Sequence, residues 1–317
     1  MREVMTVCGP AAAKELGFCQ CHEHLAISPG VSAQKNPVLL IEDEEKSLRE
    51  ALRLKSHGGG TIVDAQPGGC NRMEGVLHRI SKASHIHIIA STGFHKLCFY
   101  PENHWISQKS GKELYEIFLH ELMTGMYAGI DRAFWPEDTG IRAGIVKMAL
   151  DKEGLTPVYQ KLFLAGTHGA RDAEVPVMVH IEKESDPVAL FHFLKGEGFL
   201  PERMIFCHMD RAIPELSVHR RLLEEGVFLE YDTIGRFQYH SDQRELEIFR
   251  QMLDWGYEDR LLFSLDTTRA RLKAYTPEGV GMDYLLTNFV PKMLAQGITK
   301  KQIHKISHDN FVRVFTG

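Results

Sequence analysis

A strand, a helix and a second strand follow one another directly in residues 177–208, which read VMVHIEKESDPVALFHFLKGEGFLPERMIFCH. The two ends are short apolar runs, which is typical of strands buried on both faces. Between them, Asp186 marks the start of a helix and Gly196 lies near its end. Each strand finishes on a histidine, His180 or His208. This unit predicts parallel strands that carry polar groups at their carboxyl ends.

The same alternation extends along all 317 residues. Counting this unit, the apolar runs predict eight strands, at 17–22, 61–64, 86–90, 144–148, 177–180, 204–208, 227–231 and 261–266. Eight strand–helix repeats without a shift in composition predict an α/β fold, a (β/α)8 TIM barrel, as a single domain over 1–317. The alternative is an open, doubly wound sheet, but the GxGxxG fingerprint that would favour nucleotide binding there is absent.

One connection between the predicted strands is unusually long. Residues 99–142 separate the third strand from the fourth and hold one predicted helix, 112–126, together with Trp105 and Trp135. Long loops after barrel strands often cap active sites. The alternative is an accessory helix that packs on the barrel wall, and the sequence favours neither. The other predicted helices cover 42–57, 186–196, 214–225, 242–255 and 283–295.

Composition restricts the partners and the compartment that we expect. The formal net charge is −5, the pI is about 6.4 and no basic stripe stands out, so we expect a small-molecule substrate and no nucleic acid. The six cysteines are scattered without a CxxC pair, which favours reduced thiols in a cytoplasmic protein. We find no secretory signal and no apolar run of membrane length, and therefore expect no membrane association.

Polar groups gather at the predicted strand ends, which form the catalytic face of such a barrel. Five of the strands end in groups able to bind a metal or to become metal ligands, and these are His22, His24, Lys147, His180, His208 and Asp266. His22 and His24 lie two positions apart in an extended strand, so they point to the same face and together suit a zinc-like ion. His85 and His87 have the same spacing but lie inside a strand, and we interpret them as structural or exposed.

Several of these residues also have plainer interpretations. His180 or His208, taken singly, would more often be an ordinary buried histidine. Asp266 would be costly to bury without a cation, although it could instead cap a following helix. Lys147 would be repelled by metal ions as an ammonium group, whereas a carbamate on its amine would be negative and could bridge two metals. A lysine that pairs with Asp266 or with a substrate anion is the alternative.

Short motifs along the chain carry a resemblance to a known family. They are CHEHL at 21–25, TIVD at 61–64, STGF at 91–94, IVKMA at 145–149, VH at 179–180, CHMD at 207–210 and SLD at 264–266. In this combination the chain resembles the phosphotriesterase family of the amidohydrolase superfamily over essentially its full length. No single motif would be specific.

The resemblance implies two divalent metal ions, zinc in the first place and manganese or cobalt as alternatives. It implies that His22, His24 and Asp266 hold one ion, that His180 and His208 hold the other, and that carboxylated Lys147 bridges them together with a hydroxide. That hydroxide would attack the substrate, and Asp266 would act as the catalytic proton acceptor. Relatives of this kind are often dimers, so a homodimer is a further expectation.

The loops after the seventh and eighth predicted strands bear on the substrate. Phosphate sites in barrels often use these loops, and arginine fits phosphate or carboxylate. The loops are similar to those of family members that act on phosphorylated sugar lactones, so we predict a lactonase for a small anionic lactone. The predicted substrate-binding residues are Arg236, Arg269, Arg271, Lys273, Tyr275 and His95. His95 replaces a tyrosine that family lactonases often have, which weakens the case for acyl-homoserine lactones.

Other interpretations remain open at the level of sequence. The basic loop could be a solvated surface. The enzyme could be a phosphotriesterase or an aryl-ester hydrolase, which an apolar pocket made by Phe94, Phe99, Trp105 and Phe237 would favour. A protein of another class, which binds metal without useful catalysis, is the third alternative.

Overall fold

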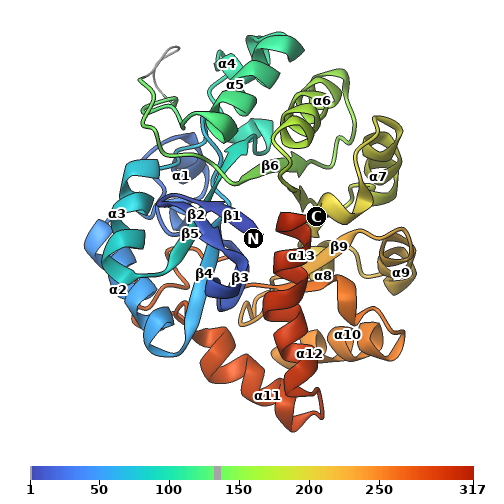
Figure 1. Ribbon diagram of the computed structural model, residues 1–317. Coiled ribbons are helices and arrows are strands. Elements are labelled where there is room, and N and C mark those ends of the chain that lie inside the picture. Colours follow the sequence, from blue (N-terminus) through green and yellow to red (C-terminus); the bar gives the residue numbers. More distant parts are fainter. Residues whose placement is uncertain (1, 132–136) are drawn as a thin grey trace.

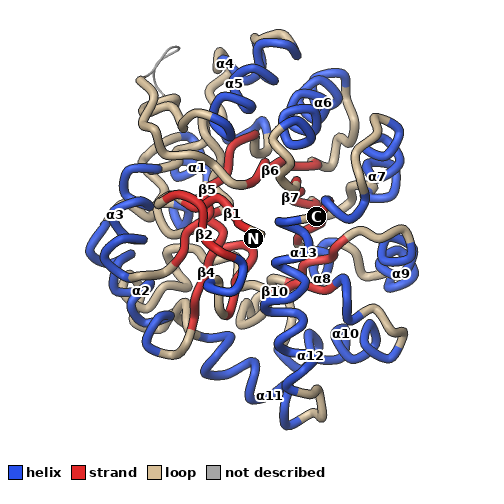
Figure 2. The backbone as a smooth tube through the Cα atoms, in the orientation of Figure 1, coloured by secondary structure: helices blue, strands red, loops and turns tan. Residues whose placement is uncertain are grey.

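The computed structural model describes residues 2–131 and 137–317. Eight parallel strands form one sheet in sequential order, and they curve into a nearly closed barrel with helices around it (Figure 1, Figure 2). They are β3 (Phe18–Glu23), β4 (Gly59–Asp64), β5 (His87–Gly93), β6 (Ile145–Leu150), β7 (Val177–Ile181), β8 (Met204–Cys207), β9 (Phe228–Tyr231) and β10 (Leu261–Phe263). The predicted TIM-barrel fold is confirmed.

Hydrogen bonds close the barrel between its last strand and its first. The backbone N–H of Asp266 donates to the carbonyl oxygen of His22 at 3.0 Å, and the hydroxyl of Ser264 donates to the same oxygen at 2.8 Å. These bonds fix the end of β3 against the segment after β10. The two chain segments with the most predicted site residues are therefore neighbours.

The amino end of the barrel is covered by elements that the sequence patterns did not reveal. These elements are β1 (Glu3–Thr6), β2 (Gly9–Ala12) and the C-terminal helix α13 (Asn310–Thr316). The first two pair as an antiparallel hairpin, and α13 lies near the hairpin over the barrel (Figure 1). Val4, Ala11 and Phe311 belong to the same buried apolar cluster as the inward side chains of the barrel strands. The barrel interior is therefore a packed core, as in other barrels of this class.

The surrounding helices follow most of the predicted patterns. Those predicted at 42–57, 186–196, 214–225 and 242–255 correspond to α2 (Glu44–Ser56), α7 (Pro187–Gly196), α9 (Leu216–Glu224) and α10 (Asp242–Asp254). The helix predicted at 283–295 is a π-helical turn, Leu285–Phe289, that continues into α11 (Val290–Ala295). Further helices are α1 (Val31–Lys35), α3 (Glu74–Ser84), α6 (Pro157–Asp172), α8 (Met209–Ala212) and α12 (Lys300–His304). In the described ranges, no helix has the length and apolarity needed to cross a membrane.

The long connection between β5 and β6 has both of the roles considered above. It contains α4 (Trp105–Gln108) and α5 (Gly111–Met123), while residues 132–136, which include Trp135, lie outside the described residues. Phe99 lines the cavity at the carboxyl end of the barrel, whereas α5 packs against α6 on the barrel wall. The buried guanidinium of Arg72 donates to both carboxylate oxygens of Glu121 in α5, at 2.7 and 2.9 Å. This pair ties the connection to the loop after β4.

Candidate metal centre

The residues singled out at the strand ends lie together at the carboxyl end of the barrel. His22 lies at the end of β3 and His24 directly follows that strand. Lys147 lies in β6 and His180 in β7, while His208 follows β8 and Asp266 follows β10. His208 and Asp266 have left-handed backbones, with φ of +63° and +49°. This conformation is uncommon outside glycine and gathers at functional sites. The backbone there is consistent with a site built at the strand ends.

His22, His24 and Asp266 form the first group of possible ligands. The Nε2 atoms of His22 and His24 lie 3.7 and 3.5 Å from Oδ1 of Asp266. Ligand atoms of all three residues lie within 4.8 Å of one another. In the described part of the chain, no helix begins between Asp266 and the π-helical turn at Leu285, so the helix-cap interpretation of Asp266 is wrong.

His180 and His208 form the second group, next to the first. Their ring centroids are 4.4 Å apart, and the ring of His208 is 4.9 Å from that of His22. Lys147 is fully buried, and its Nζ lies 3.3 Å from Nε2 of His22 rather than beside Asp266. The structure therefore brings all six predicted residues into one cluster.

The protonation states of this cluster suit a metal ion. Burial, together with nearby positive charges, lowers the pKa of His22 and of His208 well below the ordinary value. Burial also lowers the pKa of His180 to about 4. The neutral imidazole is the form that binds metals, and neutral imidazoles with a carboxylate fit zinc-like ions. The residues present therefore fit the metals that the sequence led us to expect.

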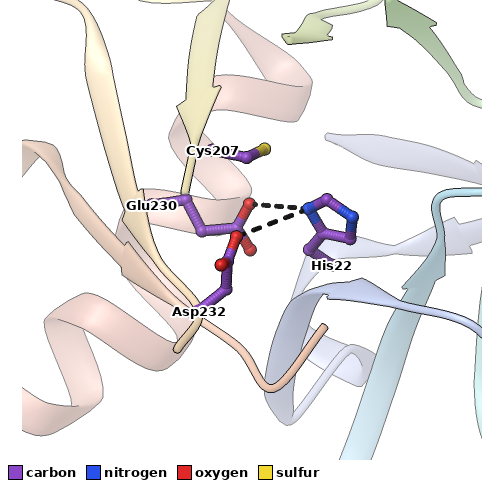
Figure 3. A group of neighbouring side chains, drawn as sticks. All are labelled: His22, Cys207, Glu230 and Asp232. Atoms are coloured by element: carbon purple, nitrogen blue, oxygen red, sulfur yellow. Dashed lines mark ion pairs between the residues drawn. The ribbon is translucent and has the colours of Figure 1, made fainter. Parts of the chain in front are cut away.

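Two acidic residues, which the sequence reasoning did not identify, lie behind the histidines. Figure 3 shows Glu230 and Asp232 directed at His22, with their oxygens 3.4 and 3.6 Å from its Nδ1. Asp232 also accepts a hydrogen bond from Nδ1 of His208 at 2.7 Å. A proton held on Nδ1 leaves Nε2 as the ligand atom, which is the usual arrangement behind metal-binding histidines. Burial raises the pKa of Glu230 to about 8 and that of Asp232 well above its ordinary value.

A cavity of about 630 Å³ opens over this cluster. Its lining includes His22, His24, His180, His208 and Asp266, together with His95, Lys96, Phe99, Arg211, Arg236 and Tyr239. Of the residues predicted to bind substrate, His95 and Arg236 therefore line the cavity.

The other four predicted substrate-binding residues do not line this cavity. Arg271 is buried and donates to the carbonyl oxygen of Ile234 at 2.6 Å. Arg269 stacks on the ring of Tyr275, 5.3 Å from its centroid, and the Tyr275 hydroxyl bonds to the segment before α2. Lys273 is exposed. The prediction that Arg269 and Arg271 bind substrate together with Arg236 is therefore wrong, because hydrogen bonds to the carbonyl oxygens of Leu40 and Ile234 hold these two side chains away from the cavity.

Arg211, which the sequence reasoning did not identify, lines the cavity together with Arg236. Its Nη2 donates to Oδ2 of Asp266 at 2.8 Å, and Nη1 of Arg236 donates to the same oxygen. Burial raises the pKa of Asp266, but Arg236 and Arg211 outweigh this effect and hold it well below its ordinary value. The Asp266 carboxylate is therefore ionised.

Comparison with known proteins gives a consistent result. The model of the "Phosphotriesterase family" matches residues 2–315. N-acetyltaurine hydrolase of Danio rerio is 28% identical, over 99% of this chain and 98% of the relative. The human protein of the same name is 26% identical, over 97% of this chain and 96% of the relative.

Solved structures of similar proteins agree over the whole chain. A lactonase from Listeria monocytogenes superposes with a TM-score of 0.89 at 25% identity, covering 99% of each chain. Organophosphorus hydrolase from Deinococcus radiodurans gives a TM-score of 0.84 at 27% identity, covering 99% of this chain and 97% of the other.

Proposed function

The chain belongs to the phosphotriesterase family, and from this premise we propose that it hydrolyses a carbonyl ester or amide bond in a small anionic molecule. Family membership and the buried histidine and carboxylate clusters give the class, a metal-dependent hydrolase. The substrate and the roles of individual residues form the proposal.

We assign the metal-binding roles as the sequence predicted them. His22, His24 and Asp266 would hold one divalent ion, His180 and His208 the other, and carboxylated Lys147 would lie between them. When bound, such ions polarise a carbonyl oxygen and lower the pKa of water. Asp232, which lies 2.7 Å from Nδ1 of His208, would keep the proton of that ring on Nδ1 when the ring binds a metal. Asp266 is the proposed proton acceptor because its Oδ1 faces the histidine nitrogens.

The anionic nature of the substrate is supported by the guanidinium groups of Arg211 and Arg236. Both lie on the cavity wall beside Asp266, where a phosphate or carboxylate could accept hydrogen bonds from them. The first candidate is therefore an anionic lactone, with a phosphorylated sugar lactone as the leading example. This pair of arginines is the single observation that carries the proposal.

A second candidate is the amide of an aminosulfonate. Relatives that are called N-acetyltaurine hydrolases match this chain over nearly all of its length. Their named substrate also combines a carbonyl group with an anion. The same arginines would serve it, so the two candidates differ in the bond that is broken rather than in the way the anion is held.

A neutral phosphotriester is less well supported. The apolar pocket that would favour it was expected from Phe94, Phe99, Trp105 and Phe237. Of these, Phe99 lines the cavity, whereas Phe94 is fully buried and Phe237 is 61% exposed. The cavity wall near the metal cluster is instead formed mainly by histidine and arginine.

The test is a panel of substrates on metal-loaded protein. It compares a sugar lactone with its phosphate, N-acetyltaurine with N-ethylacetamide, and a neutral phosphotriester. We expect at least one anionic compound to exceed its neutral partner by about tenfold or more in kcat/KM, which corresponds to ~1.4 kcal/mol. Turnover of the phosphotriester alone would refute the proposal in favour of a phosphotriesterase. Protein that binds metal and hydrolyses nothing in the panel would refute it in favour of the binding-protein alternative.

A further inference from the structure

We propose that Arg211 and Arg236, covered by the ring of Tyr239, anchor the anionic group of the substrate and accept only anions a few bonds from the scissile carbonyl. The inference rests on the proposed function. It adds to that function a limit on the distance between the anion and the scissile carbonyl, and a specificity-determining role for Arg211 that can be tested without turnover.

The two guanidinium groups contact the same carboxylate oxygen and the same aromatic ring. Arg211 and Arg236 both donate to Oδ2 of Asp266, and the ring centroid of Tyr239 lies 5.2 and 5.3 Å from their guanidinium carbons. All three side chains line the cavity. Cation–π contacts of this kind hold planar cations against an aromatic face. The pair is thus oriented before any ligand arrives, which favours binding of a planar or tetrahedral anion.

The charges of this wall leave room for an anion. Asp232 lies 3.3 Å from Nη1 of Arg211, but it is already engaged by His208. Asp266 presents one oxygen to both arginines and its other oxygen to the histidines. Among the described residues, Asp266 is the only hydrogen-bond acceptor for the Arg236 guanidinium. The two arginines therefore share one oxygen of Asp266, and Arg211 has Asp232 as a second acceptor. A guanidinium group has five N–H donors, so several donors of the pair remain for a ligand.

The position of Asp266 also limits the length of the substrate. Its Oδ1 lies 3.5 Å from Nε2 of His24, while its Oδ2 accepts from the arginines. The arginines and the histidine nitrogens thus lie on opposite sides of one carboxylate group, each in contact with one of its oxygens. A substrate that places its carbonyl at the histidines reaches the arginines with a short spacer. A long spacer would carry its anion past Tyr239, which is 52% exposed.

Binding of a ketone that cannot be hydrolysed tests the anchor separately from turnover. Laevulinate carries a carboxylate two carbons from its carbonyl, and methyl propyl ketone is its neutral counterpart. A homologue with five methylene groups between the ketone and the carboxylate tests the spacer. We would measure dissociation constants by NMR titration of zinc-loaded protein. The variants are Arg211→Gln, Arg211→Lys and, as a matched control outside the cavity, Arg269→Gln.

We expect wild-type protein to bind laevulinate at least tenfold more tightly than the neutral ketone, with most of this preference lost for the long homologue. Arg211→Gln should reduce the preference about tenfold, Arg211→Lys should restore part of it, and Arg269→Gln should leave it unchanged. Equal weakening of both ketones, through loss of metal or of shape, would show a merely structural role and overturn the proposal. An unchanged preference, or tight binding of the long homologue, would also overturn it. Failure of the proposed function would instead appear as absence of turnover in wild-type protein.

Discussion

Asp232→Asn is expected to weaken metal binding without weakening folding. Asp232 accepts hydrogen bonds from Nδ1 of His208 at 2.7 Å and from its backbone N–H at 3.1 Å. It also lies 3.6 Å from Nδ1 of His22, so one carboxylate supports proposed ligands of both ions. Asparagine keeps the shape but removes the charge. Partners of this kind are typically worth about 10- to 100-fold in metal affinity, or ~1.4–2.8 kcal/mol.

The folding stability of the metal-free protein should not fall along with the metal affinity. Asp232 is fully buried, and burial raises its pKa well above the ordinary value, so its ionised form is costly in the absence of metal. We therefore expect Asp232→Asn to leave the free energy of unfolding in chelator unchanged or to raise it by up to ~1 kcal/mol. Competition with a chelator should at the same time show weaker zinc binding.

A buried carboxylate far from the cavity provides the control. Asp283 is 4% exposed and contacts His57 at 3.2 Å on the outside of the barrel. Asp283→Asn should not change zinc affinity. Wild-type zinc affinity in Asp232→Asn, or equal losses in the two variants, would show that Asp232 does not support the ligand histidines.

Three further predictions concern the scaffold. Gly93→Ala places a Cβ 2.0 Å from a backbone oxygen of β6, whereas a Cβ at Gly9, which has nearly the same φ (+100° against +105°), meets open space. In urea unfolding, Gly9→Ala should therefore lower the free energy of unfolding by roughly 1–2 kcal/mol, and Gly93→Ala should lower it distinctly more. Glu121→Ala leaves the Arg72 guanidinium buried without its bidentate partner and should cost about 3–5 kcal/mol in the same assay. Burial lowers the pKa of His104 to about 4 in the folded protein, from 6.5 in the unfolded chain. As the pH falls from 6.5 towards 4, His104 is therefore protonated in the unfolded chain but not in the folded protein, and the folded protein loses stability. His104→Asn keeps an N-cap acceptor and should lose less stability than wild type between pH 7 and pH 5, as measured by urea unfolding.

Much of the fold followed from local patterns. Buried parallel strands are apolar along their whole length, so the runs that end at His180 and His208 could be recognised without tertiary information. The N-terminal hairpin was not predicted, because its strands, Glu3–Thr6 and Gly9–Ala12, are too short to show a periodic pattern of apolar residues. Only the packing of Val4 and Ala11 against the barrel interior explains why they form strands.

The candidate site was predictable where a residue ends a strand and less so where a loop positions it. Glu230 offered a usable signal, since a carboxylate inside the apolar run 227–231 requires a partner. Arg211 gave no such signal, because its contact with Asp266 depends on how the segment after β8 curves. Arg269 and Arg271 were misplaced for the same reason, since backbone contacts of their loop decide where their side chains point.

The proposed function requires this cluster to hold two divalent ions that take part in hydrolysis. The most direct measurement is the metal content of purified wild-type protein and of Lys147→Met, determined together with turnover of the best substrate in the panel. We predict two ions per chain in wild type, and loss of at least one ion together with turnover in Lys147→Met. A Lys147→Met protein that keeps both ions and wild-type turnover would exclude the proposed role of Lys147, and a metal-free wild type that remains active would exclude metal-dependent hydrolysis.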